Sequence, residues 1–120
     1  MALIMRVGGT RAQWWLDTMR ALLPELECRP WDDPGDPTEI HIAVVWKPPA
    51  GGLKRFPNLR GIFSIGAGVD HIYADPELPR QVPVFRLVGA DLGQRMREYV
   101  ALHVLRYHRQ LPQIQARKAT

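Results

Sequence analysis

The sequence predicts an α/β protein with a flavodoxin-like open parallel sheet and helices on both faces. Short apolar segments alternate with segments of helical periodicity along the chain, and such alternation is typical of a mostly parallel sheet covered on both sides. Ile40 to Trp46 is an almost continuous apolar, β-branched run, as expected for a central parallel strand. The length of 120 residues, with 46% hydrophobic and 23% charged residues, suits a single soluble domain.

The first half of the chain predicts two strands and one helix. Residues 2–7 are expected to form the first strand. Thr10 and Gln13 have the spacing of a capping box, so a helix is expected to begin after Thr10 and to end at Pro24. A short strand near residues 26–29 follows. The next loop, 32–37, is dense in turn residues and lacks the spacing and closing Glu of an EF-hand, which indicates a solvated loop.

The second half predicts three strands and a long helix. After the strand that ends at Trp46, residues 61–65 and 82–87 are expected to form the last two strands. Asp91 is expected to cap a helix that runs to about Leu111. Because apolar residues occupy much of its circumference, this helix is expected to be buried on more than one side.

A glycine-rich turn is the most informative motif. The apolar segment that ends at Ile65 is followed at once by Gly66-Ala67-Gly68-Val69-Asp70. Glycine reaches positive φ freely, and a turn of this kind directs backbone N–H groups at a bound anion. In open α/β sheets, ligands lie beyond the carboxyl ends of the strands. The turn therefore predicts a carboxylate or phosphate site at that edge.

A dinucleotide fingerprint is the alternative interpretation of the same turn. Gly66 and Gly68 fit the first two glycines of G-x-G-x-x-G, but His71 occupies the third position. Pro76 and Pro79 also interrupt the helix that should follow, and a proline inside a helix costs about 3 kcal/mol. The anion-binding turn is therefore favoured over a Rossmann loop.

Four stretches in order give the chain a family resemblance. The sequence resembles the D-isomer-specific 2-hydroxyacid dehydrogenases, most closely the glyoxylate/hydroxypyruvate reductase A group. The stretches are Gln13-Trp14-Trp15, Val44-Val45-Trp46-Lys47-Pro48-Pro49, Gly66-Ala67-Gly68-Val69-Asp70, and Val82-Pro83-Val84-Phe85-Arg86-Leu87 leading to Gln94-Arg95-Met96-Arg97-Glu98-Tyr99.

The resemblance implies a larger, two-domain enzyme. Residues 1–110 correspond to the flavodoxin-like substrate domain, and residues 111–120 to the start of the inter-domain hinge. The Rossmann domain that binds NAD or NADP is absent from this chain. The family's catalytic Arg, Glu and His are expected beyond Thr120, so no catalytic residue is assigned and the chain alone is expected to be inactive.

The resemblance also assigns binding roles. The backbone amides of Ala67 and Gly68 are implied to hold the carboxylate of a small 2-oxo acid of the glyoxylate or hydroxypyruvate type, while Gly66 and Val69 shape the loop. Two further side chains keep two interpretations each. Trp46 either contacts the substrate side chain or is a core aromatic, and Met96 either lies near the nicotinamide or packs in the core.

Composition restricts the remaining possibilities. The net charge is +4, but the basic residues are scattered and no nucleic-acid-binding motif accompanies them, so no nucleic acid partner is expected. Apolar runs fall far short of the roughly 20 residues that span a membrane. The lone Cys28 predicts a cytoplasmic protein without a cysteine-based metal site, and no other metal site is expected.

Two further functional classes stay open at this point. A stand-alone module that binds a small carboxylic acid without catalysis would show the same turn. An oligomerisation module would use the apolar helix instead. Uncovered apolar surface on that helix predicts self-association, and a homodimer is expected because two-fold dimers are the commonest soluble oligomers.

Overall fold

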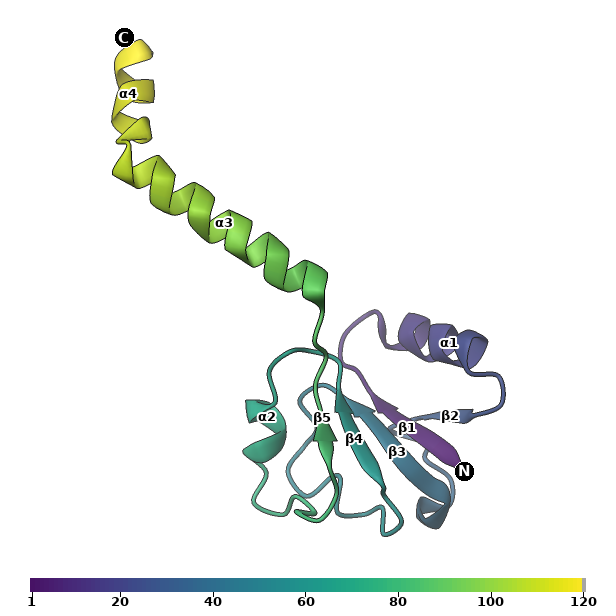
Figure 1. Ribbon diagram of the computed structural model, residues 1–120. Coiled ribbons are helices and arrows are strands. Elements are labelled where there is room, and N and C mark those ends of the chain that lie inside the picture. The colour runs from purple at the N-terminus through teal and green to yellow at the C-terminus, as the bar shows by residue number, and fades with distance from the viewer. Residues whose placement is uncertain (120) are drawn as a thin grey trace. The chain divides into compact units, whose positions relative to one another are not determined.

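The computed structural model describes residues 1–119 and falls into two compact units, Met1–Leu87 and Val88–Thr120. The first unit is an α/β sheet structure and the second is a pair of helices (Figure 1). The turn at residues 66–70 belongs to the first unit.

The first unit contains a five-stranded, all-parallel sheet in the order β2-β1-β3-β4-β5. This is the flavodoxin-like strand order, so the predicted fold class is confirmed. The predicted apolar run forms the central strand, and the last predicted strand is reduced to two residues. The strands are β1 (Ala2–Arg6), β2 (Glu27–Pro30), β3 (Ile40–Val45), β4 (Gly61–Ser64) and β5 (Val84–Phe85).

Apolar side chains cover both faces of the sheet. Successive residues of a strand point to opposite faces, so Ile4 packs in one core cluster while Leu3 packs in the other. Helix α1 (Ala12–Leu22) closes one face through Leu16. The other face is covered by Ile72 of the short helix α2 (Asp70–Tyr73) and by buried residues of the loop between β3 and β4. These loop residues are Leu53, Phe56 and Leu59.

The predicted capping box at the start of α1 is wrong. The helix begins at Ala12 with Arg11 at the N-cap, so Thr10 lies before the cap and no side chain caps the helix. The amide of Gln13 instead donates to the Asp17 carboxylate at 2.8 Å. The turn at Gly9, whose φ is +86°, delays the start of the helix.

Strand β2 forms an outer edge of the sheet that is chemically blocked. The Arg20 guanidinium donates to the Cys28 carbonyl oxygen at 3.0 and 3.2 Å, which occupies an acceptor of that strand. Pro30, two residues further on, has no backbone N–H to donate. Proline and cationic side chains are typical protection for edge strands.

The second unit consists of α3 (Ala90–His108) and α4 (Leu111–Lys118), joined at Gln110 in the left-handed conformation with a φ of 53°. Gly89, rather than Asp91, is the N-cap, and Asp91 pairs with Arg95 at 2.9 Å. A short 3₁₀ turn, η1 (Pro37–Glu39), belongs to the first unit. None of the helices within residues 1–119 is long and apolar enough to cross a membrane.

The prediction that the long helix is buried on more than one side is wrong for the described residues, since none of those in α3 or α4 is buried. Met96, Val100 and Val104 are 53%, 53% and 61% exposed. A single helix with one short neighbour offers too little surface to cover apolar side chains around most of its circumference.

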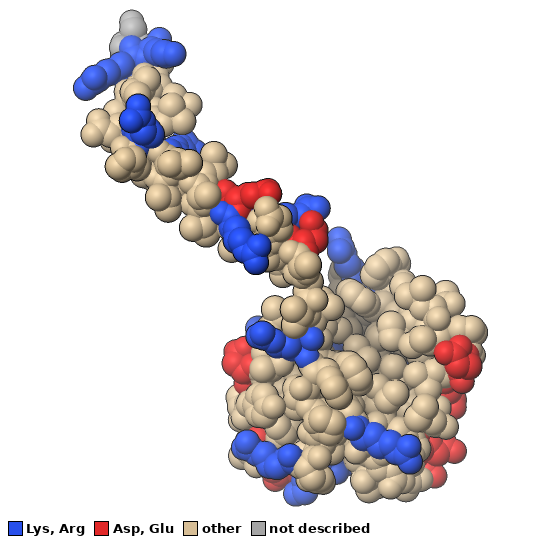
Figure 2. Space-filling model, viewed as in Figure 1, with Lys and Arg blue, Asp and Glu red and all other residues tan. Residues whose placement is uncertain are grey.

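Charge is divided unevenly between the two units. Residues 88–120 hold six of the 16 Lys and Arg residues and two of the 12 Asp and Glu residues, which leaves ten of each sign in residues 1–87. The whole formal net charge of +4 therefore belongs to the second unit, where Figure 2 shows Lys and Arg side chains along both helices.

Candidate functional site

The segments that follow β3, β4 and β5 meet at one edge of the sheet. Ile65, just after β4, donates its N–H to the Val45 carbonyl at the end of β3 at 3.3 Å. The Leu87 N–H, just after β5, donates to the Gly66 carbonyl at 3.2 Å. The glycine-rich turn, residues 66–70, thus lies where parallel topology predicted a ligand.

The turn at residues 66–70 is called the anion-binding turn below, after the ligand that the sequence predicts. Both of its glycines have their carbonyl groups bonded to the protein, and several of its amides have no acceptor within the described part of the chain. The carbonyl oxygens of Gly66 and Gly68 accept from the Leu87 N–H and the Ser64 hydroxyl, at 3.2 and 3.0 Å. The N–H groups of Ala67, Gly68 and Val69 have no acceptor among residues 1–119. Successive free amides on a turn are the donors of anion-binding nests.

The expected reason for the two glycines of the turn is wrong. Neither Gly66 nor Gly68 has a positive φ, unlike Gly9, Gly35 and Gly51. A Cβ at Gly66 would lie 2.6 Å from Cζ3 of Trp46, so close approach of the indole ring requires glycine there. A Cβ at Gly68 would meet only Oδ1 of Asp70, at 3.0 Å. The fold therefore constrains Gly66 much more strongly than Gly68.

Trp46 lies immediately after β3 and is 36% exposed. Its ring packs over Gly66 and against the His71 ring, with centroids 4.5 Å apart. The ring therefore combines core-like packing on one side with an exposed side beside the anion-binding turn. The packing fits the interpretation of Trp46 as a core aromatic in part, and its contact with a substrate stays a prediction.

Lys47 was not predicted as a site residue. Its ammonium lies 5.9 Å from the centroid of the Trp46 ring, a cation–π distance. Its φ is +46°, a left-handed conformation that is uncommon for any residue but glycine and that recurs at functional sites. A lysine directly after an apolar strand, at the ligand-binding edge, is the sequence signal for it.

His71 and Ser64 are two further residues that were not predicted. The Lys47 N–H donates to Nδ1 of His71 at 3.2 Å, and Nε2 of the same ring lies 3.4 Å from the Ser64 hydroxyl. Ser64 is only 5% exposed, and its Oγ also accepts from the Gly66 N–H at 3.2 Å. A serine at the last position of an apolar strand is the only sequence signal for this network.

The predicted site residues are distributed over both units. Trp46, Gly66, Ala67, Gly68 and Val69 come together in the first unit as described above. Met96 lies on α3 in the second unit, and its contact with a nicotinamide stays a prediction.

The turn does not fit a dinucleotide. The helix that follows it, α2, has only four residues, whereas a dinucleotide fold places the pyrophosphate on the N-terminus of a full crossover helix. The Trp46 ring also occupies the space over Gly66. The turn suits a smaller anion.

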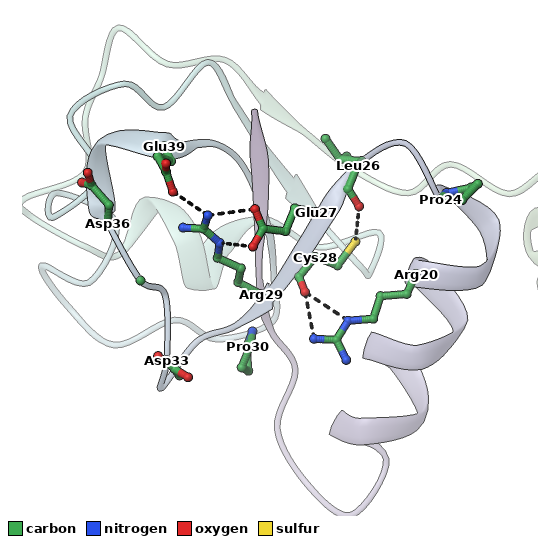
Figure 3. Close-up of a pocket in the computed structure, with 11 residues that line it drawn as sticks. Arg20, Pro24, Leu26, Glu27, Cys28, Arg29, Pro30, Asp33, Asp36 and Glu39 are labelled. Atoms are coloured by element: carbon green, nitrogen blue, oxygen red, sulfur yellow. Dashed lines mark hydrogen bonds and ion pairs between the residues drawn. The ribbon is translucent and has the colours of Figure 1, made fainter.

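A hollow of about 680 Å³ lies elsewhere in the first unit. Both of its arginines already have partners: Arg29 donates to Glu27 and Glu39, and Arg20 donates to the Cys28 carbonyl (Figure 3). Arg29 also donates to the Pro34 carbonyl. Within residues 1–119, no three His, Cys, Asp or Glu side chains are grouped to hold a metal ion. The anion-binding turn, not this hollow, is the candidate site. The hollow is lined by Arg20, Pro24, Leu26, Glu27, Cys28, Arg29, Pro30, Asp33, Gly35, Asp36 and Glu39.

No protein-family model matches the chain. It is 38% identical over 109 residues to glyoxylate/hydroxypyruvate reductase A from Serratia proteamaculans, across 87% of this chain and 34% of that protein. A D-isomer-specific 2-hydroxyacid dehydrogenase from Xanthobacter autotrophicus, solved with NADPH and MES, is 36% identical with a TM-score of 0.80, across 98% of this chain and 39% of that one.

A third relative is the NADPH-dependent glyoxylate/hydroxypyruvate reductase from Sinorhizobium meliloti, solved with NADP and sulfate. It is 33% identical with a TM-score of 0.72, across 96% of this chain and 37% of that one. The resemblance read from the sequence is confirmed, and the chain spans between 34% and 39% of the length of these relatives.

The two glycines of the turn are expected to respond differently to substitution. Gly66→Ala forces the Trp46 ring to move and should lower the free energy of unfolding by about 1–3 kcal/mol, whereas Gly68→Ala should change it by about 0.5 kcal/mol or less. Urea unfolding followed by circular dichroism measures both. Adding Trp46→Leu should remove most of the cost of Gly66→Ala, and equal costs for both alanine variants would contradict the assigned contact.

Acid should weaken the carboxylate bonds around Arg29. Hydrogen bonding to Arg29 lowers the pKa of Glu27, and hydrogen bonds from the Thr38 N–H and hydroxyl lower the pKa of Asp36. Both pKa values are lower in the folded than in the unfolded chain. Each group therefore adds stability above its unfolded pKa, and that stability is lost as the pH falls through its folded pKa.

We expect the free energy of unfolding of the unmodified chain to fall between about pH 5 and pH 3. For the double variant Glu27→Gln, Asp36→Asn, the free energy of unfolding measured by urea titration should fall less steeply over the same pH range. Glu25→Gln is the control, because Glu25 has no ion pair among the described residues. If the free energy of unfolding of the double variant depended on pH as that of the control does, Glu27 and Asp36 would not be the source of the loss in acid.

Proposed function

We propose that the chain is the substrate-domain part of a cytoplasmic NAD(P)H-dependent reductase that converts a small 2-oxo acid, of the glyoxylate or hydroxypyruvate type, to the 2-hydroxy acid. The free N–H groups of Ala67, Gly68 and Val69 carry the proposal, because they offer a carboxylate three donors on one exposed turn. Similarity to reductases of this class over about a third of their length supports it.

This chain would bind and orient the substrate. A carboxylate held by the amides of residues 67–69 places the adjacent keto carbon at a fixed distance from the anion-binding turn. Backbone donors suit this task because they are fixed by the fold and need no reorganisation when the ligand arrives. The positive charge of Lys47 would add attraction for the anion, and the exposed side of Trp46 would face the rest of the substrate.

The residues present do not fit a nicotinamide dinucleotide, so no step of hydride transfer is assigned to them. The proposal places NAD or NADP, together with the family's catalytic Arg, Glu and His, in a second domain. The two solved relatives described above contain NADPH and NADP. Met96 is proposed to approach the cofactor from this side.

A titration of the 120-residue chain with glycolate tests the proposal. In ¹H–¹⁵N spectra, the amides of Ala67, Gly68 and Val69 should shift with a dissociation constant on the order of 1 mM or weaker, because a few amides offset little of the entropy lost on association. NADPH should cause no comparable shifts anywhere in the chain.

Gly68→Val should abolish the glycolate shifts by filling the anion's space. Gly93→Val is a matched control, since a Cβ at Gly93 meets nothing within 4 Å and the site lies in the other unit. Glycolate shifts outside the anion-binding turn, or micromolar binding of NADPH, would sink the proposal.

We also propose that the chain self-associates as a homodimer through α3, whose apolar side chains are more than half exposed. Two copies of a unit with a formal charge of +4 repel each other, and salt screens this repulsion. Association driven by apolar burial should therefore strengthen as salt is added, unlike association driven by ion pairs.

Light scattering at micromolar concentration should show a dimer that becomes more populated between low and high salt. Val100→Glu lowers the positive charge of each copy and so reduces their electrostatic repulsion. It should nevertheless weaken the dimer, because it places a charge between the exposed apolar side chains of Met96 and Val104 on α3. Val88→Glu is the control with the same change in charge outside the helix. A monomer at every salt concentration would refute the dimer.

A further inference from the structure

We propose that His71 is a positioning residue of the anion-binding turn, which in one neutral tautomer fixes the outward direction of the Val69 amide through Ser64. This inference rests on the proposed function, because it concerns how the same turn is held ready for a carboxylate.

The first bond sets the tautomer of His71. The donor is the backbone N–H of Lys47, and the acceptor is Nδ1 of the ring at 3.2 Å. A ring nitrogen accepts a hydrogen bond only through a free lone pair, so Nδ1 carries no proton. In the neutral ring the proton is then on Nε2.

The second bond joins the protonated Nε2 of His71 to Ser64. Nε2 lies 3.4 Å from the Ser64 Oγ, so its N–H is a donor to that oxygen. The Gly66 N–H also donates to Oγ, at 3.2 Å. A hydroxyl has two acceptor sites and one donor. With both acceptor sites filled, its own proton is directed to the Gly68 carbonyl oxygen at 3.0 Å.

The bond from Ser64 to the Gly68 carbonyl also sets the direction of the Val69 N–H, which belongs to the same peptide unit. In a trans peptide the C=O of one residue and the N–H of the next point in opposite directions, and no cis peptide occurs among the described residues. Holding the Gly68 carbonyl toward Ser64 therefore turns the Val69 N–H away from it. The Leu87 N–H holds the Gly66 carbonyl in the same way, which turns the Ala67 N–H outward.

Different hydrogen bonds thus present two of the three amides, although both networks meet at Gly66, whose N–H donates to Ser64 and whose carbonyl accepts from Leu87. The Val69 amide depends on Ser64 and His71, whereas the Ala67 amide depends on Leu87. The His71 ring is itself held in place by Trp46, at a centroid distance of 4.5 Å and an interplanar angle of 61°. A histidine that only filled space would affect both amides alike, so a larger effect on the Val69 amide in a His71 variant would identify a positioning role.

Nuclear magnetic resonance of the 120-residue chain tests the proposal at neutral pH. Long-range ¹H–¹⁵N spectra of the imidazole should show the Nε2–H tautomer for His71. In the absence of ligand, Ser64→Ala and His71→Phe should shift the Val69 amide resonance and leave that of Ala67 nearly unchanged. Both variants should also weaken glycolate binding, by about threefold or more.

His71→Gln provides the rescue, because its terminal amide offers Ser64 a donor near the position of Nε2, and it should bind glycolate more tightly than His71→Phe. His41→Asn is the matched control. Nδ1 of His41 lies 2.7 Å from the Glu39 carbonyl at the amino end of β3, so this variant should leave the Val69 amide and glycolate binding unchanged.

Each result decides the proposal. An Nδ1–H tautomer, or equal shifts of the Ala67 and Val69 amides in the variants, would overturn it. If the unmodified chain shows no glycolate shifts, the proposed function fails. The tautomer and the ligand-free Val69 shift still decide the role of His71 in that case.

Discussion

Burial of both faces of β1 and β3 is the constraint on which the rest of the first unit depends. In a parallel sheet, each strand returns through a crossover segment that covers one face. The carboxyl ends of all strands therefore lie at the same edge of the sheet. The segments after β3, β4 and β5 are therefore brought together although they are distant in sequence. The Leu87–Gly66 and Ile65–Val45 hydrogen bonds are the local result, and the exposed amides of the anion-binding turn follow from them.

The candidate site is built from main-chain groups, and side chains serve mainly to hold them. Ser64 is buried, and its hydroxyl bonds to the turn at Gly66 and Gly68 and to the ring of His71. Trp46 fills the space beside Gly66 and packs against His71, so the turn has little freedom to collapse onto its own free donors. Main-chain donors of this kind suit a small anion, because they respond to its charge and size rather than to its other chemical groups.

Patterns that depend on neighbouring residues predicted the fold and the turn well. The apolar run at Ile40 predicted the central strand, and the glycines predicted the turn after β4. Contacts across long separations were missed. The bond between Lys47 and His71 joins residues 24 positions apart, and nothing local indicates it. The approach of Trp46 to Gly66 is equally non-local. The sequence therefore suggested a positive φ as the reason for a glycine at position 66, whereas the true reason is the nearby indole ring. Burial of α3 was predicted from its composition, but burial requires a surface to pack against.

The blocked edge at β2 limits how copies of the sheet can pair. Arg20 occupies the Cys28 carbonyl and Pro30 has no donor, so another strand gains little by pairing there. The opposite outer strand, β5, is protected in another way, because it has only two residues and lies between Pro83 and Arg86. Very short edge strands, prolines and cationic side chains all leave few free backbone groups for a further strand. Chance pairing between copies is therefore suppressed at both outer strands of the sheet by the native sequence itself.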